Sequence, residues 1–232
     1  SRSAVPVGPM ISGVARRLPN SSILGSRALT SRSVRGLNLI RRSAEVKAVI
    51  ERAGTSPCIA SCPAGIKAHG YVSLIRSGKY EEAFQLVLEA TPLVGTLGRA
   101  CYAPCEAECT RSLLEGTIPI RRLKRFVADL HYGKGMGPGV SVAEPNGFRV
   151  AIVGTGPAGL TAAWQLARAG YAVTMFDSAS KPGGFLRHAI PQYRLPHDVV
   201  DQDVANVTAL GVQIVTDHAV HDLEALKADG YD

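Results

Sequence analysis

Five cysteines lie in two groups, and their spacing suits an iron–sulfur centre better than disulfide bonds. Successive cysteines within each group are separated by three residues. In zinc sites, paired cysteines are usually separated by two residues. An odd number of thiols leaves one unpaired in any disulfide scheme. A 4Fe–4S cluster takes about four thiolates from loops, and a Cys-Pro step is frequent there. The sequence therefore predicts at most one such cluster, with ordinary core residues as the alternative, and its candidate ligands are Cys58, Cys62, Cys101, Cys105 and Cys109.

A glycine-rich turn predicts a dinucleotide site. Residues 150–153 form an apolar run typical of a parallel strand covered on both faces, and Gly-x-Gly-x-x-Gly follows. The first glycine permits a tight turn, the second lets a pyrophosphate approach the backbone, and the third lets a helix pack on the strand. The positive end of that helix favours phosphates. An empty Rossmann-like fold is the alternative, and the binding residues predicted in this turn are Gly154, Gly156, Pro157, Ala158 and Gly159.

Two later features extend this site and favour FAD as the dinucleotide. A second strand over residues 172–176 ends at Asp177, where a carboxylate can accept hydrogen bonds from the adenosine ribose. Gly183 and Gly184 lack Cβ atoms, so backbone N–H groups there can approach a flavin. A plain glycine turn is the alternative for this pair.

The elements that must position these residues fall into four segments. We expect a basic leader (1–44), a helical cysteine-rich iron–sulfur domain (45–132), a Gly- and Pro-rich linker (133–147) and an incomplete Rossmann-type FAD-binding domain (148–232). Helical spacing of apolar residues appears over 45–53, 71–90 and 118–130, with breaks expected near Pro92 and Gly95. The last helix is expected to bury Ile120, Leu123, Phe126, Val127 and Leu130. The predicted fold class is α/β: a helical domain, then a partial parallel sheet.

Charge is concentrated in the leader. The whole chain has a net charge of +7, and residues 1–44 hold eight arginines with no lysine and no acidic residue. This Ser- and Arg-rich composition predicts a mitochondrial matrix address, with a plastid or cytoplasmic location and a partner-wrapping tail as alternatives. No aromatic residue in the leader could stack on bases, which argues against nucleic-acid binding. No apolar run is long enough for a transmembrane segment.

The cysteine groups, the TIPIRRLKRF helix, the GTGPAGL turn and the GGFLRHAIPQYRLP segment together resemble the glutamate synthase small-subunit family, which includes the N-terminal half of dihydropyrimidine dehydrogenase. The resemblance covers residues 52–232. It implies a helical iron–sulfur domain, an FAD domain and an inserted NADPH domain. It also implies that Leu186 and Arg187 join the glycine pair in a second flavin-contact loop.

The same resemblance implies that Cys62, Cys101 and Cys105 bind one cluster, with Cys58 or Cys109 as the fourth ligand. Relatives can use Gln or Glu on the following helix as that ligand, where the corresponding region of this chain reads Leu123-Lys124-Arg125-Phe126. The C-x2-C pair that relatives use upstream for a second cluster is missing here. NADPH binding is expected only with a further C-terminal domain.

Two functions follow from these expectations. The first is an oxidoreductase in which electrons pass from NADPH through FAD to the cluster, with no catalytic side chain required. The second is a non-catalytic accessory subunit of an organellar assembly. Partner subunits are expected in either case.

Overall fold

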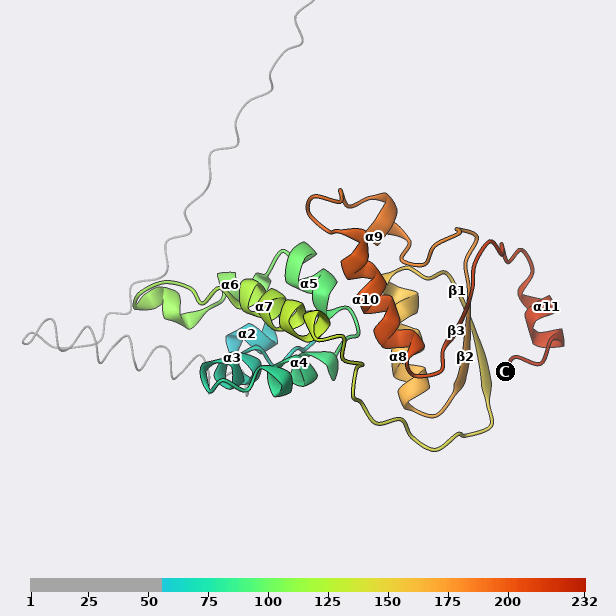
Figure 1. Ribbon diagram of the computed structural model, residues 1–232, viewed down its shortest axis with the longest axis horizontal. Helices are drawn as coiled ribbons and strands as arrows, with labels where there is room; N and C mark the ends of the chain where they lie inside the picture. The colour runs from blue at the N-terminus through green and yellow to red at the C-terminus, as the bar shows by residue number, and fades with distance from the viewer. Residues whose placement is uncertain (1–55) are drawn as a thin grey trace, which may run out of the picture. The chain divides into compact units, whose positions relative to one another are not determined.

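The computed structural model describes residues 56–232, so the leader and the helix predicted over 45–53 lie outside the described residues. In the described part, a group of helices comes first and a parallel sheet with its own helices follows (Figure 1). None of the helices in residues 56–232 has the length and apolar character needed to cross a membrane.

Short helices make up the cysteine-bearing part. The helix predicted over 71–90 is wrong as a single element, because the chain turns at Gly78 with φ of +73° and divides it into α3 and α4. The break predicted at Gly95 is also wrong, because Gly95 lies in the first turn of α5. The elements are α2 (Pro57–Ala60), α3 (Ala68–Arg76), α4 (Tyr80–Leu88), α5 (Val94–Ala100), α6 (Pro104–Ala107), the 3-10 helix η1 (Thr110–Leu113) and α7 (Ile120–Gly133).

Helix α7 matches the helix predicted over 118–130, but it turns a different face to the core. Ile120 and Val127 are buried as expected, whereas Phe126 is 41 % exposed. Lys124 and His131 are buried instead. Two ionisable side chains therefore lie inside the helical group, where their neighbours can compensate the loss of solvent.

The second part contains the predicted parallel sheet, with strand order β1-β2-β3. Arg149 pairs with Ala172, and Thr174 pairs with Gln213. The expectation that β1 is covered on both faces is wrong: β1 is at the edge of this sheet and Val153 is 53 % exposed. The elements are β1 (Arg149–Val153), α8 (Pro157–Arg168), β2 (Ala172–Phe176), α9 (Phe185–His188), α10 (His197–Thr208), β3 (Gln213–Val215) and α11 (Leu223–Ala228).

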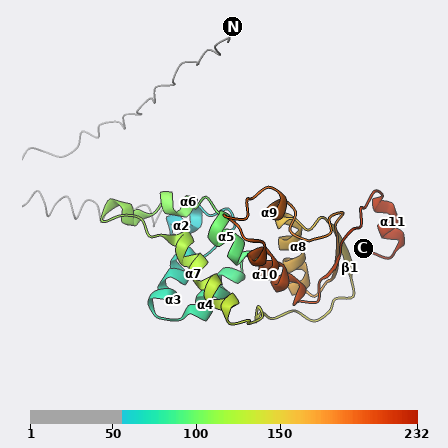
Figure 2. The same cartoon turned by 45° about the horizontal axis from the view of Figure 1, so that its top comes forward.

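Helices α8 and α10 lie between the sheet and the helical group in both views (Figures 1 and 2). Four apolar side chains at this place have no exposed surface: Leu160 and Trp164 of α8, Met175 of β2 and Val200 of α10. Burial of an apolar side chain of this size stabilises the fold by about 1.5–3 kcal/mol. Residues 134–148 join the two parts without helix or strand, and the division into separate domains there stays a prediction.

Candidate functional site

All five cysteines are free thiols located in or beside short helices. Cys58 lies in α2 and Cys62 follows that helix. Cys101 follows α5, Cys105 lies in α6, and Cys109 precedes η1. Short helices with intervening turns leave the backbone free to direct several thiols toward one place, as a cluster requires.

Four of these thiols affect the pKa of one buried tyrosine, Tyr71. The Tyr71 side chain is 1 % exposed, and its hydroxyl donates to the Ile120 carbonyl at 3.0 Å. Burial raises the pKa of Tyr71, and negative charge on the surrounding cysteines raises it further. Those cysteines are Cys105, Cys62, Cys58 and Cys101, in decreasing order of effect.

Three of the same thiols lie close enough to the buried ammonium group of Lys124 to affect its pKa. The residue is 6 % exposed on α7, and burial lowers the pKa of its side chain. Cys101, Cys62 and Cys105 oppose that decrease because thiolates stabilise the cation. Burial also raises the pKa of Cys105, an effect that Lys124 opposes. The structure thus brings together the three cysteines that the resemblance assigns to one cluster.

The loop between Cys101 and Cys105 is held in one conformation. Ala103 has φ of +58°, a left-handed conformation that costs a non-glycine residue about 1–2 kcal/mol. Its N–H donates to Cys101 Sγ at 3.3 Å. Arg121 donates from Nη1 to the Cys101 carbonyl and from its backbone N–H to Glu106 Oε1, both at 2.7 Å. These contacts offset the strain and fix the loop.

The described residues do not form a ready site for a single metal ion. Among residues 56–232, no three His, Cys, Asp or Glu side chains converge on one point as a mononuclear ion needs. A cluster is larger than one ion and receives each thiolate at a different iron. The positive charge of Lys124 would balance part of the negative charge of thiolates around it.

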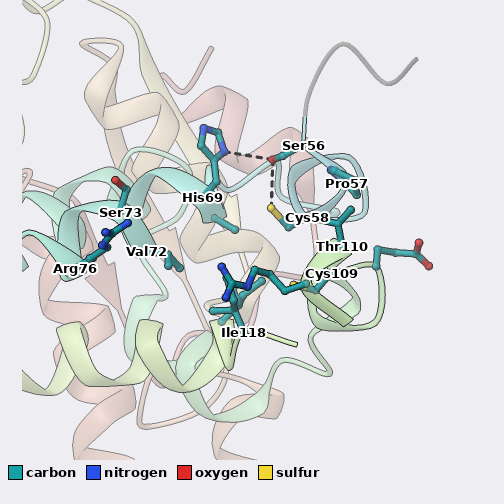
Figure 3. A pocket seen from close by; sticks show the side chains of 14 residues that line it. Ser56, Pro57, Cys58, His69, Val72, Ser73, Arg76, Cys109, Thr110 and Ile118 are labelled. Atoms are coloured by element: carbon teal, nitrogen blue, oxygen red, sulfur yellow. Dashed lines mark hydrogen bonds between the residues drawn. The ribbon is translucent and has the colours of Figure 1, made fainter. Parts of the chain in front are cut away.

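Cys109 is buried and lines a hollow that Cys58 also lines. This hollow of about 380 Å³ is lined by Cys58 and Cys109, with Arg76 and Arg111 among its other residues (Figure 3). The Cys58 thiol is 3.2 Å from the Ser56 hydroxyl. Cys58 therefore takes part in both places, which favours it over Cys109 as a neighbour of the other three thiols.

The glycine-rich turn has the geometry predicted for a dinucleotide site. Gly154 has φ of +97°, and a Cβ on Gly159 would overlap the Gly154 carbonyl oxygen. A Cβ on Gly156 would meet no protein atom within 4 Å. Gly156 precedes α8, whose 12 residues begin at Pro157 and Ala158. Open space thus lies at the N-terminus of a full helix, where a pyrophosphate is favoured.

Asp177 is bound to this turn through Thr155. Asp177 Oδ2 accepts from the Thr155 N–H at 2.7 Å and from its hydroxyl at 2.5 Å, and Oδ1 accepts from the Ala179 N–H. Partial burial opposes ionisation, but these hydrogen bonds outweigh it and lower the pKa of Asp177. The carboxylate connects the end of β2 to the turn, and the predicted ribose contact stays a prediction.

The Gly183-Gly184 loop lies against the same turn. A Cβ on Gly184 would be 2.9 Å from Gly156 Cα, and the Gly183 N–H donates to the Thr155 carbonyl at 3.1 Å. The Arg187 side chain is almost fully buried: it donates to the Pro182 carbonyl at 2.5 Å and forms an ion pair with Asp201. Arg187 and the buried Leu186 thus hold the loop, and their flavin contacts stay predictions.

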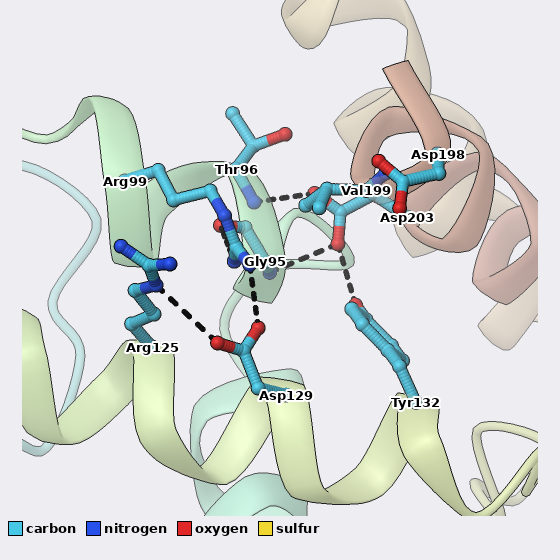
Figure 4. Close-up of polar contacts among 9 residues, drawn as sticks. All are labelled: Gly95, Thr96, Arg99, Arg125, Asp129, Tyr132, Asp198, Val199 and Asp203. Carbon is cyan, nitrogen blue, oxygen red and sulfur yellow. Dashed lines mark hydrogen bonds and ion pairs between the residues drawn. The ribbon is translucent and has the colours of Figure 1, made fainter. Parts of the chain in front are cut away.

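A buried carboxylate joins the two parts of the chain. Asp203 of α10 is fully buried and accepts hydrogen bonds from the Gly95 and Thr96 N–H groups, at 3.0 and 2.7 Å, and from the Tyr132 hydroxyl at 2.5 Å (Figure 4). Burial raises the pKa of Asp203 to about 6, although the hydrogen bonds from Thr96, Tyr132 and Gly95 oppose the rise. The first turn of α5, the helix that leads to Cys101, is therefore hydrogen-bonded to a side chain of the Rossmann part.

Sequence reasoning did not assign roles to Tyr71, Thr155 or Asp203. A signal for Asp203 existed, because it follows the apolar Val199 and Val200 at helical spacing and so falls on the buried face of α10. The sequence holds no comparable signal for Thr155 or Tyr71. Their contacts come from segments far away in the chain.

Comparison with known proteins identifies two families in this chain. Residues 44–136 match the family described as dihydropyrimidine dehydrogenase domain II, 4Fe-4S cluster. Residues 152–209 match the family described as NAD(P)-binding Rossmann-like domain. The first match contains all five cysteines, and the second contains the whole glycine-rich turn from Gly154 to Gly159.

Curated relatives match two thirds or more of this chain. The NADP(+)-dependent formate dehydrogenase subunit beta of Moorella thermoacetica is 39 % identical over 181 residues, which cover 69 % of this chain and 26 % of that protein. The NAD-dependent dihydropyrimidine dehydrogenase subunit PreT of Escherichia coli K12 is 36 % identical over 182 residues, which cover 75 % of this chain and 43 % of that protein. Glutamate synthase [NADH] of Schizosaccharomyces pombe is 35 % identical over 155 residues, which cover 67 % of this chain and 7 % of that protein.

These findings confirm the resemblance noted in the sequence. The chain carries a match to the dihydropyrimidine dehydrogenase domain II 4Fe–4S family followed by a match to the NAD(P)-binding Rossmann-like family, and it is similar to oxidoreductase subunits over both regions. It spans less than half the length of each of these three relatives.

Proposed function

We propose that this chain is the cluster- and flavin-binding part of an NAD(P)H-linked oxidoreductase, carrying electrons between a nicotinamide and a partner subunit. The observation that carries the proposal is the gathering of thiols around Lys124 in a chain that also has an open phosphate-binding turn at Gly156. The relatives whose names include NADP(+) or NAD support the choice of a nicotinamide. Their description as subunits supports the presence of a partner.

FAD fits the glycine-rich turn. The N–H groups at the start of α8 would stabilise its pyrophosphate, and Gly184 would bring a second backbone segment against the same phosphates. Asp177 would hold the ribose while keeping its contacts to Thr155, because each carboxylate oxygen has two acceptor positions. Bound here, FAD would supply two-electron exchange with a nicotinamide and one-electron exchange with an iron–sulfur centre.

One 4Fe–4S cluster fits the cysteine group. We assign Cys62, Cys101, Cys105 and Cys58 as its ligands, because these four act together on Tyr71. The Ala103 N–H would donate a hydrogen bond to a ligand sulfur, and Lys124 would place positive charge beside it. Hydrogen bonds and charge near the sulfurs are the means by which proteins adjust a cluster's reduction potential.

Cofactor reconstitution tests the flavin assignment. The full chain is incubated with FAD, freed of unbound cofactor, and examined for flavin absorbance and for the identity of the released dinucleotide. Gly156→Val should abolish binding, because a side chain would enter the phosphate position, yet it should leave the circular dichroism spectrum unchanged because no protein atom is within reach. Gly137→Val is the matched control, since its Cβ also meets open space.

Two results would reject the flavin assignment. One is a folded wild-type chain that releases a nicotinamide dinucleotide but no flavin. The other is a Gly156→Val variant that retains FAD as well as the Gly137→Val control does.

A further inference from the structure

Arginines from three separate segments line an open hollow beside the cysteine loop. Its volume is about 340 Å³. Arg99 comes from α5, three arginines come from α7, and Arg194 comes from the loop between α9 and α10. The charged residues are Arg99, Arg121, Arg122, Arg125 and Arg194, and Gly98 and Tyr193 complete the lining.

Close packing of α5 on α7 concentrates this charge. A Cβ on Gly98 would lie 2.7 Å from Arg125 Cα, so only glycine permits this distance between the helices. Arg99 and Arg125 then reach the same carboxylate, Asp129, at 2.7 and 3.3 Å (Figure 4). One acidic group therefore orders two guanidinium groups on the rim of the hollow.

Much of the positive charge remains uncompensated. Asp129 neutralises one charge of the five, and the Cys101 carbonyl that receives Arg121 carries no formal charge. Within residues 56–232, neither an ion pair nor a hydrogen bond engages the guanidinium of Arg122 or Arg194. An arginine cluster of this kind produces a local positive potential that attracts acidic partners.

The hollow also adjoins the cysteine group. Arg121 lines it and donates at 2.7 Å to the carbonyl of Cys101, one of the proposed cluster ligands. A partner seated on the arginines would therefore lie close to the cluster without displacing any thiol. Tyr193, 90 % exposed in the same lining, offers an aromatic anchor of the type enriched at protein interfaces.

From these observations we propose that the arginine hollow is the docking surface for the acidic face of a one-electron carrier protein. The proposal rests on the proposed function, because it uses the cluster as the centre that exchanges electrons. One electron crosses such an interface without a bond being made or broken: the carrier gains the electron that the chain loses, or the reverse. An extended acidic face suits the site better than a small anion, because three of the five arginines already have protein partners.

Binding of an acidic ferredoxin to the full chain tests the surface. The ferredoxin is titrated against the cluster-free and the reconstituted chain by calorimetry, at low and at physiological ionic strength. Arg122→Glu combined with Arg194→Glu should weaken binding by about tenfold or more, and added salt should weaken wild-type binding. Arg76→Glu combined with Lys79→Glu is the control, because both residues are exposed and the net charge changes equally.

Three outcomes would overturn the proposal: equal weakening by the control pair, unchanged binding in the arginine variant, or loss of FAD from the arginine variant with ferredoxin binding intact. The last would assign the hollow to the cofactor. Circular dichroism verifies folding, and Arg122→Gln with Arg194→Gln, which should show a smaller loss, gives a second measure. Binding to the cluster-free chain needs neither FAD nor iron, so it can succeed even where the proposed function fails.

Discussion

Asp203 should make the stability of this chain fall as the pH rises from about 4 to about 7. Burial raises its pKa from 3.8 to about 6 in the folded state. Between those two values the folded chain binds more protons than the unfolded chain, so each unit of increasing pH lowers the free energy of unfolding. A shift of about two units, at about 1.4 kcal/mol per unit, gives a loss of about 3 kcal/mol from this one group.

Comparison with Asp203→Asn isolates this effect from the other titrating groups. Hydrogen bonds lower the pKa of Asp177 and of Glu81 despite their partial burial. These two groups therefore act in the opposite direction: their contribution to the stability of the chain decreases as the pH falls. Asn has nearly the same shape as protonated Asp and does not titrate. The variant should cost about 1–2 kcal/mol at pH 4, where one hydrogen bond is impaired, and should match or exceed wild-type stability at pH 7.

Urea unfolding of both proteins at several pH values gives the required difference. Asp198→Asn, on the exposed side of the same helix, is the control and should show no comparable pH dependence. If the cost of Asp203→Asn instead grows as the pH rises, then the hydrogen bonds from Gly95, Thr96 and Tyr132 keep the carboxylate ionised. The reasoning from burial would then be refuted.

Three further predictions concern the cofactor sites and the leader. Cys101→Ala should prevent iron and sulfide incorporation on anaerobic reconstitution, whereas Cys109→Ala should retain both; iron loss in both variants would contradict the ligand assignment. Gly159→Ala should cost about 1–3 kcal/mol in urea unfolding because its Cβ overlaps the Gly154 carbonyl, and a change within error of zero would contradict the packing. Residues 1–44 fused to a fluorescent reporter should direct it to mitochondria, and a diffuse cytosolic signal would count against targeting.

The parallel sheet could be predicted closely because its signals are local. The strand at residues 172–176 and the turn from Gly154 to Gly159 depend on residues adjacent in the chain. The turn at Gly78 was missed because apolar spacing continues on both sides of it, and spacing alone cannot show a reversal of chain direction.

The cysteine site could be predicted only in outline. The spacing of the cysteines indicates a cluster, but it says nothing about which other side chains are buried beside them. The sequence shows only that the region from Leu123 to Phe126 lacks a Gln or Glu ligand, and its apolar pattern assigns Phe126 to the core of α7. In the structure Lys124 is buried in place of Phe126, and the thiols of Cys62, Cys101 and Cys105 oppose the decrease that burial causes in the pKa of Lys124.

Helix α5 acts as a spacer of fixed length between the two parts of the molecule. It begins on Asp203 of the Rossmann part and ends at Cys101 of the cysteine group. Seven residues at 1.5 Å each give a length of about 10 Å. One inserted residue would lengthen the helix only slightly, but it would rotate Cys101 by about 100° around the helix axis. Insertions and deletions in α5 should therefore be tolerated far less well than in residues 134–148, which form neither helix nor strand.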